Sequence, residues 1–481
     1  MARWELAITL DPASKVPLFQ QIAEAIARDI ARGRLAPDQR MPGSRTLAAT
    51  LGVHRNTTVA AYETLVAEAW LCARRAGGTF VAPEMPLARP RRFAGEAPGA
   101  RDTPGFALTP STLPEGPDPP RGAVSLSDGT PDLRLLPRAA LASAWKVALG
   151  GHGAPLSYGA TRGEPSLRRA VARMVSETRA VAADEDRVLI TRGSQMALDL
   201  AARALLAAGD VVAVESIGYA PAWRAFERAG AALAPLPVDR EGVSVDAFEA
   251  LVKTHAVRAI YVTPHHQYPT TVALSPSRRV KLLSLAAEHR VAVLEDDYDH
   301  EFHYASTPIA PLASADAAGV VIYLGTLSKI LAPGLRTGFV VAPRAVIDRL
   351  AVERAVTDRQ GDRVTERALA TLFEEGAVQR HVRRARRIYE ARRDACAASL
   401  RRHLGDRVRF EVPDGGLSLW VEAPGVDVDA WAARALATGV AVRTGRMFRH
   451  DGAASAHVRV GYGQLDEREV DAAIAKLAKA L

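Results

Sequence analysis

The sequence predicts a multidomain protein, with a small N-terminal α+β domain, a linker, and a larger α/β domain built on a mainly parallel sheet. Its 481 residues are too many for one ordinary hydrophobic core. Helical periodicity with turn signals fills residues 1–83, and nine prolines fall within residues 84–122. From residue 123 to 481, short apolar runs alternate with helical stretches, which is typical of a parallel sheet covered on both faces.

The composition is typical of a globular protein and argues against a membrane-spanning or secreted one. Hydrophobic residues make up 48% of the chain and charged residues 24%, which is ordinary for a globular protein. No apolar run reaches the eighteen or so residues that span a bilayer, so we expect no membrane partner. The N-terminus lacks a secretory apolar segment, and two cysteines make no disulfide framework, so we expect a cytoplasmic protein. The net charge of +8 permits an anionic partner without requiring one.

Two helices are predicted first in residues 1–83. In PLFQQIAEAIARDIARG, Pro17 is placed to start a helix and Gly33 to end it. In MPGSRTLAATLGV, Ser44 is the expected N-cap and Gly52 the expected C-terminal stop. The first helix carries an apolar stripe of Leu18, Ile22, Ile26 and Ile30.

A third helix and a hairpin follow. HRNTTVAAYETLVAEAW places Val59, Tyr62 and Val66 on one helical face. LCARRAGGTFVAP contains two β-prone runs around Gly77 and Gly78, which is a hairpin signal. Two short helices around a glycine-containing turn, followed by a hairpin, describe a winged helix-turn-helix.

The stretch RMPGSRTLAATLGVHRNTTVAAYETLVAEAWL resembles the GntR family of DNA-binding domains. The helix that opens at residue 54 presents donors and acceptors at its N-terminal end, where a recognition helix meets base edges. The preceding helix offers an arginine for a phosphate or guanine edge, and the wing can approach the minor groove. Taken singly, the arginines could equally solvate a helical face. The expected DNA contacts are Arg45, His54, Arg55, Asn56, Thr57 and Gly78.

Chemistry-bearing residues follow three apolar runs of the larger domain, at the strand ends where sites on parallel sheets lie. RGSQ (192–195) follows VLIT and leads into a helix, which suits a phosphate. EDDY (295–298) follows VAVL, and buried carboxylates there need a cation. Ser328 and Lys329 follow IYLGT, with Arg336 further on. Taken alone, each stretch has a simpler structural explanation: RGSQ could be a tight turn, EDDY a solvated acidic loop, and Lys329 a surface lysine.

Together these residues are the parts needed to hold pyridoxal 5'-phosphate (PLP). The lysine forms a Schiff base with the aldehyde. An acid that pairs with the pyridinium nitrogen preserves the ring as an electron sink, and a phenol can hydrogen-bond the ring hydroxyl. Arginine and serine side chains neutralise the phosphate.

Residues 123–481 resemble the fold type I aminotransferases, and the fusion to a GntR-like head resembles the MocR/GabR group of PLP-dependent transcriptional regulators. We expect a large domain at about 150–350 and a small domain at about 351–481 that includes an arm, 123–150. The stretches that carry the resemblance are SDGTPDLRLLP, SYGATRGEPSLRRAVA, GSQMALDL, YVTPHHQYP, EDDYDHEFHY and GTLSKILAPGLRTGF.

The resemblance implies roles by position. Lys329 would be the Schiff-base lysine, Asp296 the partner of the pyridine nitrogen, and Tyr298 a neighbour of the ring hydroxyl. Strand alternation favours Asp296 over Asp297, because consecutive side chains point to opposite sides. Tyr219 matches the aromatic residue that stacks on the ring. The phosphate would be held by Gly193, Ser194, Gln195, Ser328 and Arg336.

Two further roles follow from the same resemblance. Tyr158 matches a tyrosine that reaches the phosphate from the partner subunit, which implies a head-to-tail homodimer. Arg459, in HVRVGYG, matches the arginine that grips a substrate carboxylate, although alone it could be a surface charge at a strand edge. HHQYPTT lacks the Asn-Pro of ordinary aminotransferases, and Ile217 stands where relatives often carry proline, so the effector stays open.

The sequence therefore predicts a transcription regulator that binds operator DNA and PLP, and senses PLP or a small amino compound by aldimine exchange. Candidate effectors by resemblance include PLP itself, γ-aminobutyrate, taurine and other small amines. The alternative is an active aminotransferase tethered to DNA; because Lys329 is retained, turnover stays open, and slow half-transamination is compatible with the regulator. No metal ligand is predicted. The basic stretch 378–404 is either a solvated or subunit-facing helix or an auxiliary DNA-backbone contact.

Overall fold

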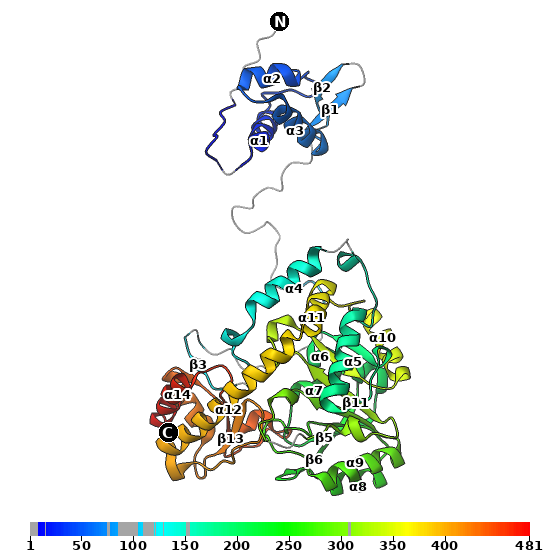
Figure 1. Ribbon diagram of the computed structural model, residues 1–481, viewed down its shortest axis with the longest axis vertical. Coiled ribbons are helices and arrows are strands. Elements are labelled where there is room, and N and C mark those ends of the chain that lie inside the picture. The colour runs from blue at the N-terminus through cyan, green and yellow to red at the C-terminus, as the bar shows by residue number, and fades with distance from the viewer. Residues whose placement is uncertain are drawn as a thin grey trace. The chain divides into compact units, whose positions relative to one another are not determined.

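The computed structural model describes residues 8–14, 16–74, 77–84, 104–108, 120, 122–127, 129–150, 154–305 and 309–481. It divides into two compact units, Met1–Pro114 and Glu115–Leu481 (Figure 1). The division falls inside the segment 84–122 that the sequence predicts as a linker. Most of that segment, namely residues 85–103, 109–119 and 121, lies outside the described residues.

The N-terminal unit is a winged helix-turn-helix, as predicted. Its elements are α1 (Leu18–Ala31), α2 (Ser44–Leu51), α3 (Arg55–Ala67), β1 (Leu71–Arg74) and β2 (Gly78–Val81). The two strands form an antiparallel hairpin in which Leu71 pairs with Val81. The predicted stripe of α1 packs into the core, where Ile22, Ile26 and Ile30 are buried.

One local prediction for this unit is wrong: Ser44 is the first residue of α2, and the N-cap is Gly43. The face of α3 that carries Val59, Tyr62 and Val66 is only partly covered. Val66 is 40% exposed, whereas Ala61 and Leu65 are fully buried.

A seven-stranded sheet forms the centre of the C-terminal unit, in the order β4-β12-β11-β10-β9-β5-β6. The strands are β4 (Val188–Thr191), β5 (Val211–Glu215), β6 (Ala232–Leu236), β9 (Val257–Val262), β10 (Ala292–Asp297), β11 (Val321–Thr326) and β12 (Gly338–Val341). Neighbours from β11 to β6 run parallel, whereas β12 is antiparallel to both β11 and β4. The sheet is mainly parallel, as its nearly unbroken apolar strands predict.

Helices cover both faces of this sheet (Figure 1). Side chains of α4, α5, α8, α9 and α11 pack on one face, and those of α6, α7 and α10 pack on the other. The helices are α4 (Arg138–Gly150), α5 (Pro165–Arg179), α6 (Gly193–Leu205), α7 (Ala220–Arg228), α8 (Val245–Thr254), α9 (Pro276–His289), α10 (Arg344–Thr357) and α11 (Arg363–Glu374). This is the fold class that the sequence predicts.

A second core lies around a three-stranded antiparallel sheet in the order β13-β16-β15. Its strands are β13 (Ser418–Glu422), β15 (Arg443–Thr444) and β16 (His457–Gly461), and its helices are α12 (Ala377–Leu404), α13 (Val428–Ala437) and α14 (Glu467–Lys479). The short β3 (Val124–Ser125) pairs in parallel with β14 (Val440–Ala441), which joins the start of the arm to this subdomain. The small β7 (Val238–Asp239) and β8 (Gly242–Val243) form a separate hairpin.

The boundary between the two subdomains differs from the expected one near residue 351. That position lies inside α10, whose Ile347 and Leu350 pack on the large sheet. The next helix, α11, also belongs to the core of the large sheet through Ala368 and Leu369. After α11, the chain enters the core of the small subdomain within α12, from Ala385 onward.

Candidate functional site

The expected DNA-contacting residues lie in α2, at the start of α3 and at the wing. Arg45 in α2 and His54, Arg55 and Asn56 at the start of α3 are all exposed, and Thr57 is half-buried. His54 accepts a hydrogen bond from the backbone N–H of Asn56 at 3.3 Å, so it caps the helix that carries the other side chains. This arrangement leaves the N-terminal end of α3 open to a partner.

The wing begins at Gly78, which is exposed and has φ of +98°. A glycine takes up this left-handed backbone without the penalty that other residues meet. The tip residues 75 and 76 lie outside the described residues.

In the C-terminal unit, a cavity of about 370 Å³ lies at the carboxyl ends of the central strands. Its walls come from the turn into α6, from the ends of β9, β10 and β11, and from β15 and β16 of the small subdomain. The predicted residues that line it are Ser194, Gln195, Tyr219, Asp296, Tyr298, Ser328, Lys329, Arg336 and Arg459. Gly193 lies directly beside it, against the guanidinium of Arg336.

Asp296 is a buried carboxylate in the wall of the cavity. Its Oδ2 accepts a hydrogen bond from the Tyr261 hydroxyl at 2.8 Å, whereas its Oδ1 has no partner among the described residues. Burial raises the pKa of Asp296 to about 7, and the bond from Tyr261 opposes this shift only in part. A cation near Oδ1 would therefore stabilise the ionised form.

Asp297 faces the other side of β10. Its Oδ2 accepts from the Tyr323 hydroxyl at 2.7 Å and lies 2.8 Å from Nδ1 of His300. Burial opposes ionisation here too, but His300 and Arg179 outweigh it and hold the pKa of Asp297 well below its ordinary value. The pKa values of these two adjacent carboxyls are therefore shifted in opposite directions. Of the two, only Asp296 lines the cavity.

Lys329 lies opposite this acid, just past the end of β11. Its Nζ donates a hydrogen bond to the backbone oxygen of Gly129 at 2.8 Å. The charge of Lys329 also favours the ionised form of Asp296. An amine and an acid therefore face one cavity, which suits a ligand with an aldehyde at one position and a basic ring nitrogen at another.

The turn into α6 forms the anion-binding end. Gly193 has φ of +75°, and a Cβ there would lie 3.0 Å from the Arg336 guanidinium, so glycine lets that group approach the helix start. Ser194 lies in the first turn of α6 and Ser328 on the facing loop. Gln195 donates to the Pro221 carbonyl at 3.1 Å, and its Oε1 has no partner among the described residues. A helix N-terminus with a nearby guanidinium is suited to a phosphate.

Three tyrosines line another wall. The rings of Tyr219 and Tyr268 meet edge to face at 5.5 Å, and those of Tyr268 and Tyr298 at 5.9 Å. The hydroxyl of Tyr298 donates to the backbone oxygen of His266 at 3.0 Å. Burial raises the pKa of Tyr219 to about 12, so its phenol stays neutral near pH 7.

Two arginines close the cavity from the small subdomain. Arg443 on β15 and Arg459 on β16 are cross-strand partners, and both line the cavity. Arg459 is 4% exposed, its guanidinium lies 4.6 Å from the ring centroid of Tyr268, and its Nε has no partner among the described residues. Like charges on paired strands repel unless an anion lies between them.

Tyr158 does not line the cavity of its own chain. Its side chain is 73% exposed, and the guanidinium of Arg359 lies 4.1 Å from its ring centroid. The ring therefore points outward from the C-terminal unit.

Sequence reasoning missed several residues of the cavity. Tyr261 and Thr263 sit at the end of a run interpreted only as a strand, and Tyr261 bonds Asp296. Gly129 belongs to SDGTPDLRLLP, whose resemblance to aminotransferases implies no role for this glycine. Arg443 carried no signal, because only the antiparallel register brings it beside Arg459.

Comparisons with known proteins agree with this geometry. Residues 18–81 match the model of the bacterial regulatory proteins, gntR family, and residues 121–477 match that of aminotransferase class I and II. The chain is 33% identical to the probable rhizopine catabolism regulatory protein MocR of Rhizobium meliloti, over 86% of this chain and 83% of that protein. It is 32% identical to the HTH-type transcriptional regulator TauR of Rhodobacter capsulatus, over 98% of each chain.

Among solved structures, a kynurenine aminotransferase of Pyrococcus horikoshii superposes with a TM-score of 0.70 at 30% identity, over 75% of this chain and 91% of that chain. The fold and the cavity thus define a DNA-binding transcription regulator with an aminotransferase domain. The chain belongs to the MocR-type regulators, in which a GntR-family winged helix-turn-helix precedes a class I and II aminotransferase domain. Its cofactor is pyridoxal phosphate. Asp296, whose Oδ1 has no partner among the described residues, lines the same cavity as Lys329 and fits that cofactor.

Proposed function

We propose that this chain is a cytoplasmic regulator that holds PLP on Lys329 and changes its DNA binding when a small amino compound occupies the same cavity. The observation that carries the proposal is Lys329 facing the buried Asp296, on a chain that also bears a DNA-binding head. When bound, PLP supplies an aldehyde that combines reversibly with primary amines. The other steps belong to the side chains of the cavity.

Each group then has one task. Lys329 would hold the aldehyde of PLP with its amine, which is the group that a primary amine competes with. Asp296 would pair with the ring nitrogen and hold a proton there. Ser194, Ser328 and Arg336 hold the phosphate at the start of α6. The neutral phenol of Tyr219 covers the ring without adding charge.

The two arginines indicate the chemical class of the effector. Arg459 is buried, its Nε has no partner among the described residues, and Arg443 lies beside it on the neighbouring strand. A carboxylate at this end of the cavity would give the buried Arg459 guanidinium a partner. We therefore expect an effector with a primary amine at one end and a carboxylate or similar anion at the other.

The effector binds between two subdomains, because Lys329 comes from the large sheet and the arginines from the small subdomain. An effector that contacts both favours a closed arrangement by the difference in its affinity for the two states. We propose a head-to-tail homodimer in which the outward-facing Tyr158 reaches the partner's cavity, so that closure is transmitted to a pair of DNA heads.

The first experiment measures binding of the full-length protein to its own upstream DNA at fixed salt. Apo protein, PLP-loaded protein, and PLP-loaded protein with a panel of amino acids and amines are compared. The sensor proposal is supported if one compound changes the affinity or footprint of the wild-type protein on DNA. The same compound should have no such effect on Arg459→Gln or Lys329→Ala. A change produced by PLP alone would make PLP the effector.

The alternative is an aminotransferase tethered to DNA, which the retained Lys329 and the intact cavity keep open. Steady keto-acid production with DNA binding that no compound alters would establish that alternative and overturn the sensor. Production limited to about one keto acid per bound cofactor is compatible with the sensor, because it is half of the transamination cycle.

A further inference from the structure

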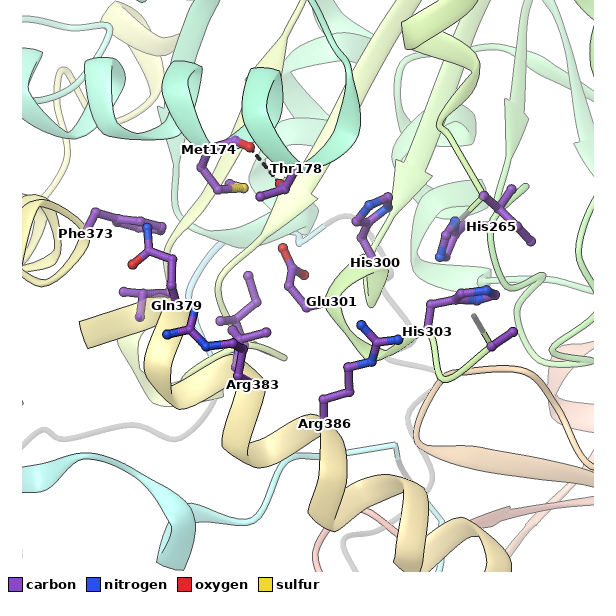
Figure 2. Close-up of a pocket in the computed structure, with 15 residues that line it drawn as sticks. Met174, Thr178, His265, His300, Glu301, His303, Phe373, Gln379, Arg383 and Arg386 are labelled. Carbon is purple, nitrogen blue, oxygen red and sulfur yellow. Dashed lines mark hydrogen bonds between the residues drawn. The ribbon is translucent and has the colours of Figure 1, made fainter. Parts of the chain in front are cut away.

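Four histidines gather on the side of β10 away from the PLP cavity. His265 and His266 follow β9, and His300 and His303 lie in the turn after β10. The ring of His265 lies 4.4, 4.6 and 5.5 Å, centroid to centroid, from those of His266, His300 and His303. Figure 2 shows three of them, His265, His300 and His303, together at one end of a second cavity of about 340 Å³.

His265 is the centre of the group and has an unusual environment. His265 is only 2% exposed, yet neither its Nδ1 nor its Nε2 has a hydrogen-bond partner among the described residues. A buried polar group without a partner is costly, by roughly 1–3 kcal/mol. A metal ion would give one of these ring nitrogens a partner, because imidazole nitrogen is a common metal ligand.

His266 is prepared in the way that metal-bound histidines are. Its Nδ1 lies 2.8 Å from Oδ1 of Asp299, which is also buried. When Nδ1–H donates a hydrogen bond to this carboxylate, the lone pair of the neutral ring lies on Nε2. A carboxylate that orients a ligand histidine is a recurring feature of zinc sites. The backbone of Gly415 packs closely against this ring, because a Cβ there would lie 2.3 Å from Nε2, so only glycine fits at that position.

The spacing of the nitrogens fits tetrahedral coordination. Nε2 of His266 and Nδ1 of His303 are 3.5 Å apart. Two imidazole nitrogens bound to one Zn²⁺ at 2.0–2.1 Å in a tetrahedron are about 3.3–3.4 Å apart. The ligand atoms of His265, His266 and His303 all lie within 4.8 Å of one another, so small rotations of buried rings would bring them to one ion.

We propose that His265, His266 and His303 bind one divalent transition-metal ion of the zinc class, with Asp299 as the carboxylate that orients His266. Three imidazoles suit Zn²⁺ better than Mg²⁺ or Ca²⁺, which prefer oxygen ligands. The fourth position would face the second cavity. This inference does not rest on the proposed sensing of an amino compound.

A second set, His265 with Asp297 and His300, also has ligand atoms within 4.8 Å. Oδ2 of Asp297 already accepts from Tyr323 and lies against His300, whereas its Oδ1 has no partner among the described residues. We favour the first set because Asp299 already orients His266 and because the nitrogens of His266 and His303 are spaced for one tetrahedral ion. Arg383 and Arg386 line the same cavity and reach in from α12 (Figure 2). These charges repel a cation, which places the ion at the inner, histidine end of the cavity.

The test is Zn²⁺ binding to the full-length, untagged protein, measured by metal content after dialysis and by competition with a chromogenic chelator. We expect one Zn²⁺ per chain. His265→Gln and His303→Gln should each weaken binding by more than about 100-fold, and Asp299→Asn by about 10–100-fold. The control His255→Gln changes an exposed histidine outside the cluster and should bind as the wild type does.

Two outcomes would overturn the proposal. One is a wild-type chain that takes up less than a stoichiometric amount of Zn²⁺ at micromolar concentration. The other is retention of that Zn²⁺ by both histidine variants. Circular dichroism checks that each variant is folded. Visible absorption of Co²⁺ bound to the wild-type protein is a second test that needs no variant. Intense bands support a tetrahedral site, and the weak bands of an octahedral ion contradict it.

His300→Gln separates the two ligand sets. Binding that survives this change supports the proposed ligands. If only His265→Gln and His300→Gln abolish binding, the proposed set is wrong and the ion belongs to the Asp297 side of the cluster.

Discussion

Replacing Asp296 by asparagine should change how the stability of the apo protein depends on pH. Burial raises the pKa of this carboxyl from its ordinary 3.8 to about 7 in the folded protein. A raised pKa means that the folded chain holds a proton which the unfolded chain has released. The stabilisation from Asp296 is therefore complete below about pH 4 and is lost as pH rises through about 7.

The size of the effect follows from these two pKa values. Integrating proton binding from pH 5 to pH 8, with pKa values of 3.8 unfolded and about 7 folded, gives a loss of about 2.5 kcal/mol from this one group. Asp296→Asn removes the titration. Burial likewise raises the pKa of Glu295 to about 8, and this carboxyl is the same in both proteins, so its titration cancels in the comparison. Burial also raises the pKa of Glu215 to about 7, with a smaller contribution from the charge of Asp296, so the titration of Glu215 cancels only in part.

The assay is urea unfolding of apo wild type and Asp296→Asn at pH 5 and pH 8. The wild type should lose about 2.5 kcal/mol more than the variant between these values. Asp246→Asn, a change to an exposed carboxyl, should behave as the wild type does to within about 0.5 kcal/mol. Equal losses in wild type and Asp296→Asn would refute the raised pKa and the reasoning built on it. Loading with PLP should reduce the difference, because a positive ring nitrogen stabilises the ionised carboxylate.

Three further predictions concern other parts of the chain. Arg55→Ala should weaken binding to the operator by about 1–3 kcal/mol if this side chain reads a base, whereas an equal loss on unrelated DNA would make it a phosphate contact. Tyr261→Phe removes the donor to Asp296 and should weaken PLP binding by about 1 kcal/mol in an absorbance titration; unchanged affinity would contradict the role of that bond. Asp132→Ala leaves the Arg392 guanidinium buried without its carboxylate at 2.9 Å, so denaturation should show a loss of about 3–5 kcal/mol, and a loss under 1 kcal/mol would refute the buried pair.

Much of the fold could be predicted because its signals are local. The apolar runs that became β4, β5, β9, β10 and β11 are bounded by turn residues, and burial on both faces favours apolar side chains along most of their length. The main exception is the acidic end of β10, which carries the site. Where a predicted feature depended on tertiary packing, the sequence was a weaker guide. The exposed Val66 and the boundary near residue 351 are set by which neighbouring element covers a face, and no local pattern records that.

The site shows the same division. Residues directly after a strand, such as Asp296 and Lys329, could be located because strand ends of a parallel sheet share one edge. Arg443 could not, since its place beside Arg459 depends on the register of two strands in another subdomain. The histidine cluster could not be predicted either, because His265 and His303 come from separate loops. The spacing of the histidines within each loop is not a known metal-ligand motif.

The arm that follows the linker has a consequence for how the two ends of the protein communicate. Its β3 is a strand of the small subdomain, and a few residues later its Gly129 accepts the hydrogen bond of Lys329 Nζ and packs against Arg459. The peptide that tethers the DNA head is therefore fastened at the mouth of the ligand cavity rather than at a remote surface. Any ligand that draws Lys329 or the small subdomain to a new position also moves the anchor point of that tether.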